Sequence, residues 1–267
     1  MLPNILSIAG SDPSGGAGIQ ADIKAISANG GYAMAVINGL TAQNTKGVQA
    51  VELVSLDMIA AQIASIRDDI HIDAIKIGML GDARVIETVA TALDGCDAPI
   101  VLDPVMVAKS GDRLLSADAI VAMRERLLPR AHVITPNLPE AADLLGMAEA
   151  NSSEAMQSHG QSLRALGANA VLIKGGHLAG EDALDWLLNG SETLQLHSPR
   201  IATRNTHGTG CTLPAALATQ IGAGQTLSKA AWLAKAYITD AIAAAGRLDV
   251  GSGHGPVHHF HTQQEGI

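Results

Sequence analysis

The sequence feature that most constrains the fold is a repeated alternation of two kinds of segment. Short runs rich in Val and Ile recur along the chain, each followed by a cluster of Gly, Pro, Asp or Asn and then by a longer Ala-rich segment with helical spacing. This pattern predicts β-strands that alternate with α-helices. Because the strands are almost continuously apolar, we expect both faces of a mostly parallel central sheet to be covered by helices.

The expected elements follow from this pattern. Strands are predicted at residues 4–9, 32–38, 74–79, 99–104, 132–137, 170–176 and 193–202. Helices are predicted at residues 19–30, 55–69, 82–93, 116–128, 138–146 and 153–167. No Pro/Ser linker or charge run divides the sequence, so we expect residues 1–267 to form a single α/β domain, a three-layer αβα sandwich. The Gly- and His-rich stretch at residues 251–267 is interpreted as a surface extension.

Composition narrows the class of partner. The formal net charge is −9 with no basic block, whereas nucleic acids and anionic membranes require clustered Lys and Arg, so we expect neither as a partner. The two cysteines, Cys96 and Cys211, are too few for a disulfide framework or a metal site built from CxxC pairs. The first residues lack the basic region of a signal peptide. We therefore expect a cytoplasmic protein that acts on a small soluble ligand.

Polar residues gather where the predicted strands end. Asp103 ends one strand, Asn137 and Glu140 follow another, and Lys174 ends a third. Ligands of parallel sheets bind outside these carboxyl ends. Taken singly, each residue could be a helix cap or turn residue, and Lys174 could point to solvent. Together they offer oxygen ligands suited to Mg²⁺, Asp103 and Glu140 foremost, beside a positive charge, as phosphoryl transfer requires.

The segment NTHGTGCT, residues 205–212, precedes a helix expected from about residue 212. Gly208 and Gly210 allow a tight turn and a close approach of backbone to ligand, and the helix start would point N–H groups at the same spot, which predicts an anion hole. No Gly-Lys-Ser/Thr follows, so the segment is not a Walker A motif. Cys211 at this helix start is expected to have a lowered pKa and to accept a proton from a substrate hydroxyl. A plain Gly-rich helix cap and an inert buried cysteine are the alternatives.

These segments resemble the ribokinase-like superfamily, and within it the hydroxymethylpyrimidine and phosphomethylpyrimidine kinases of thiamine biosynthesis. The matching motifs lie at residues 9–25, 40–45, 76–80, 102–106, 108–115, 135–141, 171–177, 205–212 and 255–261, nearly from end to end. The resemblance implies a ribokinase-like fold and ATP-dependent phosphorylation of 4-amino-5-hydroxymethyl-2-methylpyrimidine, and then of its monophosphate. It also implies ATP and Mg²⁺ as cofactors and a homodimer.

The resemblance implies roles for particular residues. The anion hole for the transferring phosphate would be formed by Gly208, Thr209, Gly210 and Cys211, with Cys211 at the position where sugar kinases of the superfamily carry an aspartate base and with Lys174 as a further catalytic residue. The substrate-binding residues would be Gly10, Asp22, Gln43, Met79 and Val105. Asp22 is also a candidate helix cap. Residues 108–115 are expected to form a lid, with Lys109 and Arg113 meeting phosphate.

Gln43 separates the candidate substrates on physical grounds. An aminopyrimidine presents a ring-nitrogen acceptor beside an amine donor, and a carboxamide matches this pair with two hydrogen bonds, as it does for adenine. Pyridoxal lacks the pair, so a pyridoxal or pyridoxine kinase, which would share the anion hole, is the alternative enzyme. A non-catalytic regulatory module that only binds the pyrimidine is the alternative from another class. A metal site at His258, His259 and His261 is disfavoured because HHFH does not supply a convincing ligand set.

Overall fold

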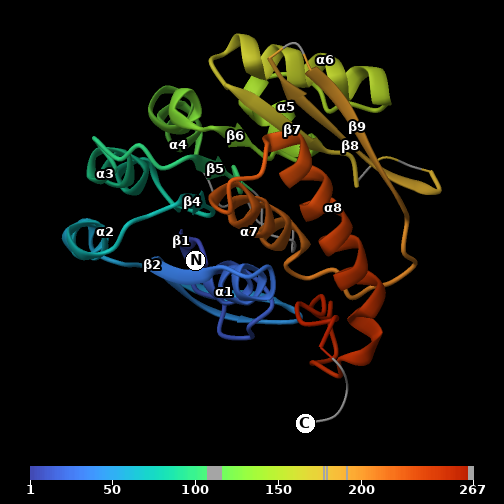
Figure 1. Ribbon diagram of the computed structural model, residues 1–267, viewed down its shortest axis with the longest axis horizontal. Helices are drawn as coiled ribbons and strands as arrows, with labels where there is room; N and C mark the ends of the chain where they lie inside the picture. The colour runs from blue at the N-terminus through green and yellow to red at the C-terminus, as the bar shows by residue number, and fades with distance from the viewer. Residues whose placement is uncertain (107–115, 177, 179, 191, 264–267) are drawn as a thin grey trace.

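The computed structural model describes residues 1–106, 116–176, 178, 180–190 and 192–263. Within these residues one nine-stranded sheet has the order β3-β2-β1-β4-β5-β6-β7-β8-β9 (Figure 1). Its strands are β1 (Asn4–Gly10), β2 (Tyr32–Asn44), β3 (Gly47–Leu53), β4 (Ala74–Ile77), β5 (Ile100–Leu102), β6 (Val133–Ile134), β7 (Ala170–Lys174), β8 (Asp182–Asn189) and β9 (Glu192–Pro199). Six adjacent strands pair in parallel, in the order β2, β1, β4, β5, β6 and β7. Strands β3, β8 and β9 are antiparallel additions at the two edges. The expected mostly parallel sheet is confirmed.

Helices cover both faces of the sheet (Figure 1). One face is covered by α2 (Leu56–Asp69), α3 (Ala83–Ala92), α4 (Ala117–Ala122) with its extensions η1 (Met123–Leu127) and η2 (Leu128–Arg130), α5 (Leu138–Leu145) and α6 (Ser153–Ala165). The other is covered by α1 (Gly18–Ala28), α7 (Thr209–Gly222) and α8 (Leu227–Ala243), with η3 (Ala244–Arg247) after it. Two apolar clusters fill the space between these layers and the sheet, which gives the expected αβα sandwich. None of the described helices is long and apolar enough to cross a membrane.

Three elements were not anticipated from the sequence pattern. The edge strand β3 is largely exposed, so its side chains carry no burial pattern. Asp185 interrupts the apolar residues of β8, so the sequence does not mark this segment as a strand. Helix α8 follows a Gly-rich turn beyond the last helix that the sequence pattern predicted. Strand β2 also runs six residues past its predicted end, because its outer half pairs with β3 in a hairpin.

The prediction of a surface extension at the C-terminus is wrong for most of its described part. Residues 251–261, here called the C-terminal strap, include the buried Pro256, Val257 and His259. The His254 N–H donates to the Thr45 carbonyl at 2.8 Å, and the His207 N–H donates to the Gly255 carbonyl at 3.0 Å. The strap therefore ties the β2–β3 turn to the segment that begins α7.

Candidate active site

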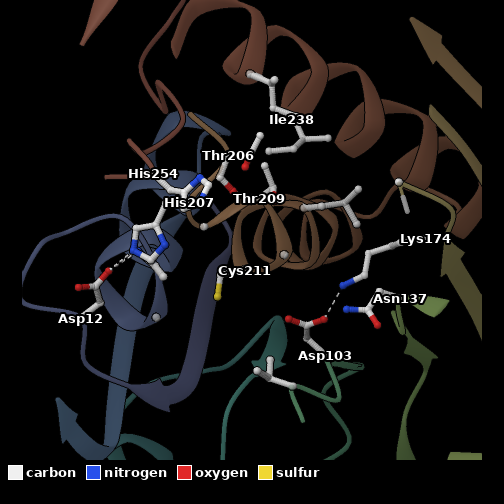
Figure 2. A pocket seen from close by; sticks show the side chains of 18 of the residues that line it. Asp12, Asp103, Asn137, Lys174, Thr206, His207, Thr209, Cys211, Ile238 and His254 are labelled. Atoms are coloured by element: carbon white, nitrogen blue, oxygen red, sulfur yellow. Dashed lines mark hydrogen bonds and ion pairs between the residues drawn. The ribbon is translucent and has the colours of Figure 1, made fainter. Parts of the chain in front are cut away.

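A cavity of about 960 Å³ lies at the carboxyl ends of the parallel strands. Twelve of the thirteen predicted site residues line it, namely Gly10, Gln43, Met79, Asp103, Val105, Asn137, Glu140, Lys174, Gly208, Thr209, Gly210 and Cys211. Figure 2 shows Cys211 between the Asp12–His207 side of the cavity and the Asp103–Lys174 side. Segments that are far apart in the sequence thus converge on one space, as the strand-end rule predicts.

Asp22 is the exception. Its side chain is fully buried on α1, where one carboxylate oxygen, Oδ2, accepts hydrogen bonds from Ser7 Oγ at 2.6 Å and from Lys76 Nζ at 2.8 Å. It does not line the cavity, so the structure does not support the expected direct contact with substrate. Asp22 is joined to the cavity wall by its hydrogen bond with Lys76, which does line the cavity.

The GTG turn forms the start of α7. Gly208 is the N-cap, with φ of 81° in the left-handed region, and a Cβ there would lie 1.7 Å from the carbonyl oxygen of Gly16. Only glycine fits this position. The helix begins at Thr209 and not near 212, so Gly210 and Cys211 lie in its first turn, where the amide groups have no carbonyl four residues earlier in the helix. The predicted anion hole therefore has the required backbone geometry.

The expectation for Cys211 itself needs correction. Burial raises the pKa of the Cys211 thiol to about 11; Lys76 lowers it, and Asp22 and Asp103 raise it further. Removal of the thiolate from water outweighs the charge of Lys76 and the position at a helix start. The free protein therefore holds a thiol at neutral pH and not the thiolate that the helix-terminus argument predicted.

Asp103, Lys174 and Glu140 form a charged cluster at the opposite side of the cavity. Lys174 Nζ lies 2.9 Å from Asp103 Oδ1 and 4.0 Å from a carboxylate oxygen of Glu140. Burial alone would lower the pKa of Lys174, but the two carboxylates raise it, so the ammonium stays charged. Burial raises the pKa of Glu140 to about 7 in spite of Lys174. Lys174 faces the cluster, which excludes the alternative of a solvent-directed side chain.

Asn137 and Glu140 also cap α5. Asn137 Oδ1 accepts from the Glu140 N–H at 2.9 Å, and Glu140 Oε2 accepts from the Asn137 N–H at 2.8 Å, which is a reciprocal capping box. The alternative interpretation of these two residues as helix-capping residues is therefore correct. Because both line the cavity as well, the cap fixes their side chains at its wall.

Asp12 and His207 join the two glycine-rich segments of the site. His207 Nε2 lies 2.8 Å from Asp12 Oδ2, and a dashed line marks this contact in Figure 2. The Asp12 carboxylate also accepts from the N–H groups of Ser14, Gly16 and Ala17. Burial alone would raise the pKa of Asp12, but these hydrogen bonds lower it to about 2. The loop before α1 is thereby fixed against the residue that precedes the anion hole.

Sequence reasoning missed several residues of the cavity. Ile238 and Ile242 come from α8, and Lys235 of the same helix pairs with Asp185 of β8 at 2.7 Å. Lys76 lies in β4 at 0% exposure. A lysine inside an otherwise apolar strand was the available signal, since a buried lysine needs a partner. Lys109 and Arg113 of the expected lid lie outside the described residues.

The chain matches known proteins over nearly its whole length. The family model described as phosphomethylpyrimidine kinase matches residues 12–258. A hydroxymethylpyrimidine/phosphomethylpyrimidine kinase of Escherichia coli K12 is 51% identical, over 97% of this chain and 98% of the relative.

Two solved structures are similar as well. A Bacillus subtilis pyridoxal kinase, solved as an ADP complex, has a TM-score of 0.90 at 39% identity and covers 97% of this chain and 98% of its own. A Clostridium difficile phosphomethylpyrimidine kinase has a TM-score of 0.80 at 41% identity, over 90% of this chain and 99% of its own.

Proposed function

Because the chain belongs to the phosphomethylpyrimidine kinase family and is therefore a phosphotransferase, we propose that it transfers the γ-phosphoryl group of ATP to the hydroxymethyl group of 4-amino-5-hydroxymethyl-2-methylpyrimidine. It then phosphorylates the resulting monophosphate to the diphosphate, as steps in thiamine biosynthesis. The observation that carries this proposal is the meeting of Gln43 and the GTG turn on one cavity. The whole chain, residues 1–267, acts as one ribokinase-like kinase domain.

Gln43 recognises the pyrimidine by hydrogen bonding. It lies at the β2 side of the register shift in the β2–β3 hairpin, and its amide oxygen accepts a hydrogen bond from Thr41 Oγ1 at 3.3 Å. The amide can therefore present an acceptor and a donor to the amino group and ring nitrogen of the substrate. Met79 and Val105 supply apolar wall, and a Cβ on Gly10 would lie 2.5 Å from Met79 Cε, so glycine makes room for that wall.

ATP occupies the remainder of the cavity, with its phosphates toward the anion hole. The ADP complex of the Bacillus subtilis neighbour supports adenine-nucleotide binding. Ile238 and Ile242 of α8 offer apolar surface for a base on the far side of the GTG turn, and Figure 2 shows Ile238 above Thr209. Such an apolar surface suits the flat adenine ring of ATP, and the polar GTG turn suits the ATP phosphates.

Different residues of the cavity have different roles in phosphoryl transfer. The substrate hydroxyl lies between Cys211 and the γ-phosphoryl group. In the fraction of the enzyme whose Cys211 thiol has first released its proton to solvent, the hydroxyl proton passes to Sγ as the oxygen attacks phosphorus and ADP leaves. The N–H groups at the start of α7 hold the oxygens of the transferring group, and Lys174 balances their charge. Since the transition state of this transfer is loose, the hydroxyl proton leaves late and needs little help from a base, so a small fraction of Cys211 thiolate is sufficient.

Asp103 and Glu140 fit Mg²⁺ that arrives with ATP. No three His, Cys, Asp or Glu side chains in the described part of the chain are grouped so as to hold a metal alone. Two carboxylates at the cavity wall suit a cation that keeps water and takes phosphate oxygens as its other ligands. Bound there, Mg²⁺ would neutralise charge on the phosphates.

The functional unit is a homodimer in the cytoplasm, where ATP is available. The β2–β3 edge supports the dimer, because Leu40, Val51 and Leu53 leave 51%, 48% and 36% of their surface exposed there. Exposed apolar residues on an edge strand are a typical interface between copies of a chain. Light scattering of the purified protein measures its mass directly, and a monomer at working concentration contradicts this assignment.

The test of substrate choice compares two hydroxymethyl compounds. Pyridoxal kinase is the second candidate because the Bacillus subtilis neighbour carries that activity at a TM-score of 0.90. Steady-state assays with ATP and Mg²⁺ measure kcat/KM for the hydroxymethylpyrimidine and for pyridoxal. We expect the pyrimidine to be preferred by at least tenfold. A preference for pyridoxal would reassign the substrate, and binding of the pyrimidine without ADP formation would indicate the non-catalytic module.

A further inference from the structure

Lys76 is a buried charge that the mechanism above does not use. Its side chain on β4 is fully buried, and its Nζ lies 2.8 Å from Asp22 Oδ2 on α1. It nevertheless lines the cavity together with Cys211 and Asp103. Burial of an ion pair removes two charges from water, and an apolar pair of similar volume often stabilises a fold as well or better. Stability alone therefore does not explain this pair.

The surrounding structure fixes the position of Lys76. Ser7 Oγ donates to the same Asp22 oxygen at 2.6 Å, while Asp22 Oδ1 is buried with no hydrogen-bond partner among the described residues. A Cβ on Gly78 would lie 2.6 Å from Lys76 Nζ, so the chain has its smallest residue where the ammonium needs space. Three elements, β1, β4 and α1, thus hold one ammonium group at the cavity wall.

Lys76 and Cys211 line the same cavity, so the fixed ammonium is placed to act on the thiol. The charged groups that influence the thiol are Lys76, Asp22, Asp103 and Lys174, and the Gly18 backbone adds a hydrogen bond. Among the charged side chains Lys76 has the largest effect, and it favours the thiolate. Lys174 is bonded directly to Asp103 and serves the opposite side of the cavity.

We propose that Lys76, held by Asp22 and Ser7, is a positioning residue for catalysis: it is the fixed positive charge that stabilises Cys211 as an anion and as proton acceptor from the substrate hydroxyl. Once the Cys211 thiol has released its own proton to solvent, the hydroxyl proton moves to Sγ as the oxygen attacks phosphorus, and the ammonium itself neither gains nor loses a proton. This role rests on the proposed kinase function. It predicts that removal of the charge slows the chemical step without preventing binding of either substrate.

The test compares Lys76→Met with Lys229→Met, a matched change at an exposed lysine of α8. Lys76→Met should lower kcat by ~10²–10³-fold, the typical effect of one lost electrostatic contact to developing charge, and leave the KM for ATP within threefold. Lys229→Met should leave both constants unchanged. Lys76→Met leaves the Asp22 carboxylate in the core without its ion-pair partner. The double variant Lys76→Met/Asp22→Leu therefore removes both charges, and it should fold, bind ATP and show the same loss of kcat.

A second readout does not depend on activity. In a Cys96→Ser background, the rate of iodoacetamide alkylation of Cys211, measured as a profile from pH 7 to pH 10, should fall at least tenfold at each pH in both Lys76 variants and not in Lys229→Met. A folded Lys76 variant with wild-type kcat and an unchanged alkylation profile overturns the proposal. If the wild-type protein does not phosphorylate the pyrimidine, the proposed function fails instead, and the alkylation profile still decides whether Lys76 acts on Cys211.

Discussion

Under the proposed function, Gln43 and Cys211 have separate roles, since Gln43 binds the pyrimidine and Cys211 accepts the hydroxyl proton. Gln43 comes from a hairpin beyond the parallel sheet, and Cys211 comes from the first turn of α7. Recognition by Gln43 depends on side-chain hydrogen bonds, whereas the anion hole beside Cys211 is made of backbone. Changes to the two side chains should therefore affect different kinetic constants.

Gln43→Ala should weaken pyrimidine binding. The substrate loses a paired hydrogen-bonding group at a cost of roughly 1–3 kcal/mol, so its KM should rise at least tenfold while the KM for ATP stays constant. The matched control is Gln49→Ala, at an exposed position of the same hairpin, which should leave both constants unchanged. A KM within twofold of wild type for folded Gln43→Ala would remove Gln43 as the reader of the pyrimidine.

Cys211→Ala should slow the chemical step and spare binding. Loss of a positioned proton acceptor typically lowers kcat by ~10²–10⁴-fold, and the backbone anion hole remains in place. Cys96→Ala makes the same change away from the cavity and should retain kcat. Retention of most of the wild-type kcat in Cys211→Ala would leave the anion hole without a thiol base.

The pH dependence of thiol chemistry has a definite sign. With a pKa of about 11, Cys211 holds little thiolate at pH 7, so its alkylation rate should keep rising with pH up to that value. Bound pyrimidine should protect the thiol. A rate that is already constant above pH 8 would mean that the helix start lowers the pKa after all.

At the scale of elements, the site depends on contacts between loops and strands that are distant in sequence. Asp12 and His207 link the loop before α1 to the start of α7, and the C-terminal strap links α7 to the β2–β3 turn. These contacts fix the loop before α1, the β2–β3 hairpin and the start of α7 relative to one another. Proper alignment of two substrates accounts for a large part of the rate of a transfer reaction.

Asp12→Asn tests the first of these links through stability. The pKa of Asp12 is depressed from 3.8 to about 2, so the charged carboxylate stabilises the fold above pH ~4, and this contribution is lost as pH falls through 2. The difference is worth about 2 kcal/mol at pH 7. Chemical denaturation at pH 7 should show that loss in Asp12→Asn, with a flatter pH dependence between pH 4 and 2. The exposed Asp57→Asn should behave as wild type, and an equal loss there would contradict the link.

The sequence pattern predicted the interior of the fold better than its edges. Strands β1, β4 and β7 are buried on both faces, so hydrophobicity marks them directly. The exposed β3 has no such hydrophobic pattern. Gln43 was predicted as a site residue from the motif at residues 40–45 and not from a predicted strand. The strap escaped prediction because its glycines and histidines resemble a solvated tail, while its burial comes from long-range contacts with Thr45, His207 and Thr212.

For the molecule as a whole, the candidate site was largely predictable because strand ends converge in any parallel sheet. That rule, with the motifs, located Asp103, Lys174 and the GTG turn. Two features depended on three-dimensional burial and could not be predicted: the raised pKa of Cys211 and the withdrawal of Asp22 behind Lys76. Both arise from desolvation, which depends on packing around a residue and not on its neighbours in sequence.

The central claim is that one cavity phosphorylates a hydroxymethylpyrimidine twice. Phosphorus NMR of the protein mixed with ATP, Mg²⁺ and 4-amino-5-hydroxymethyl-2-methylpyrimidine follows each phosphorylated species in time. We predict that a pyrimidine monophosphate signal rises first and is then replaced by the diphosphate as ADP accumulates. Unchanged ATP, or ADP and inorganic phosphate without any phosphorylated pyrimidine, would contradict it.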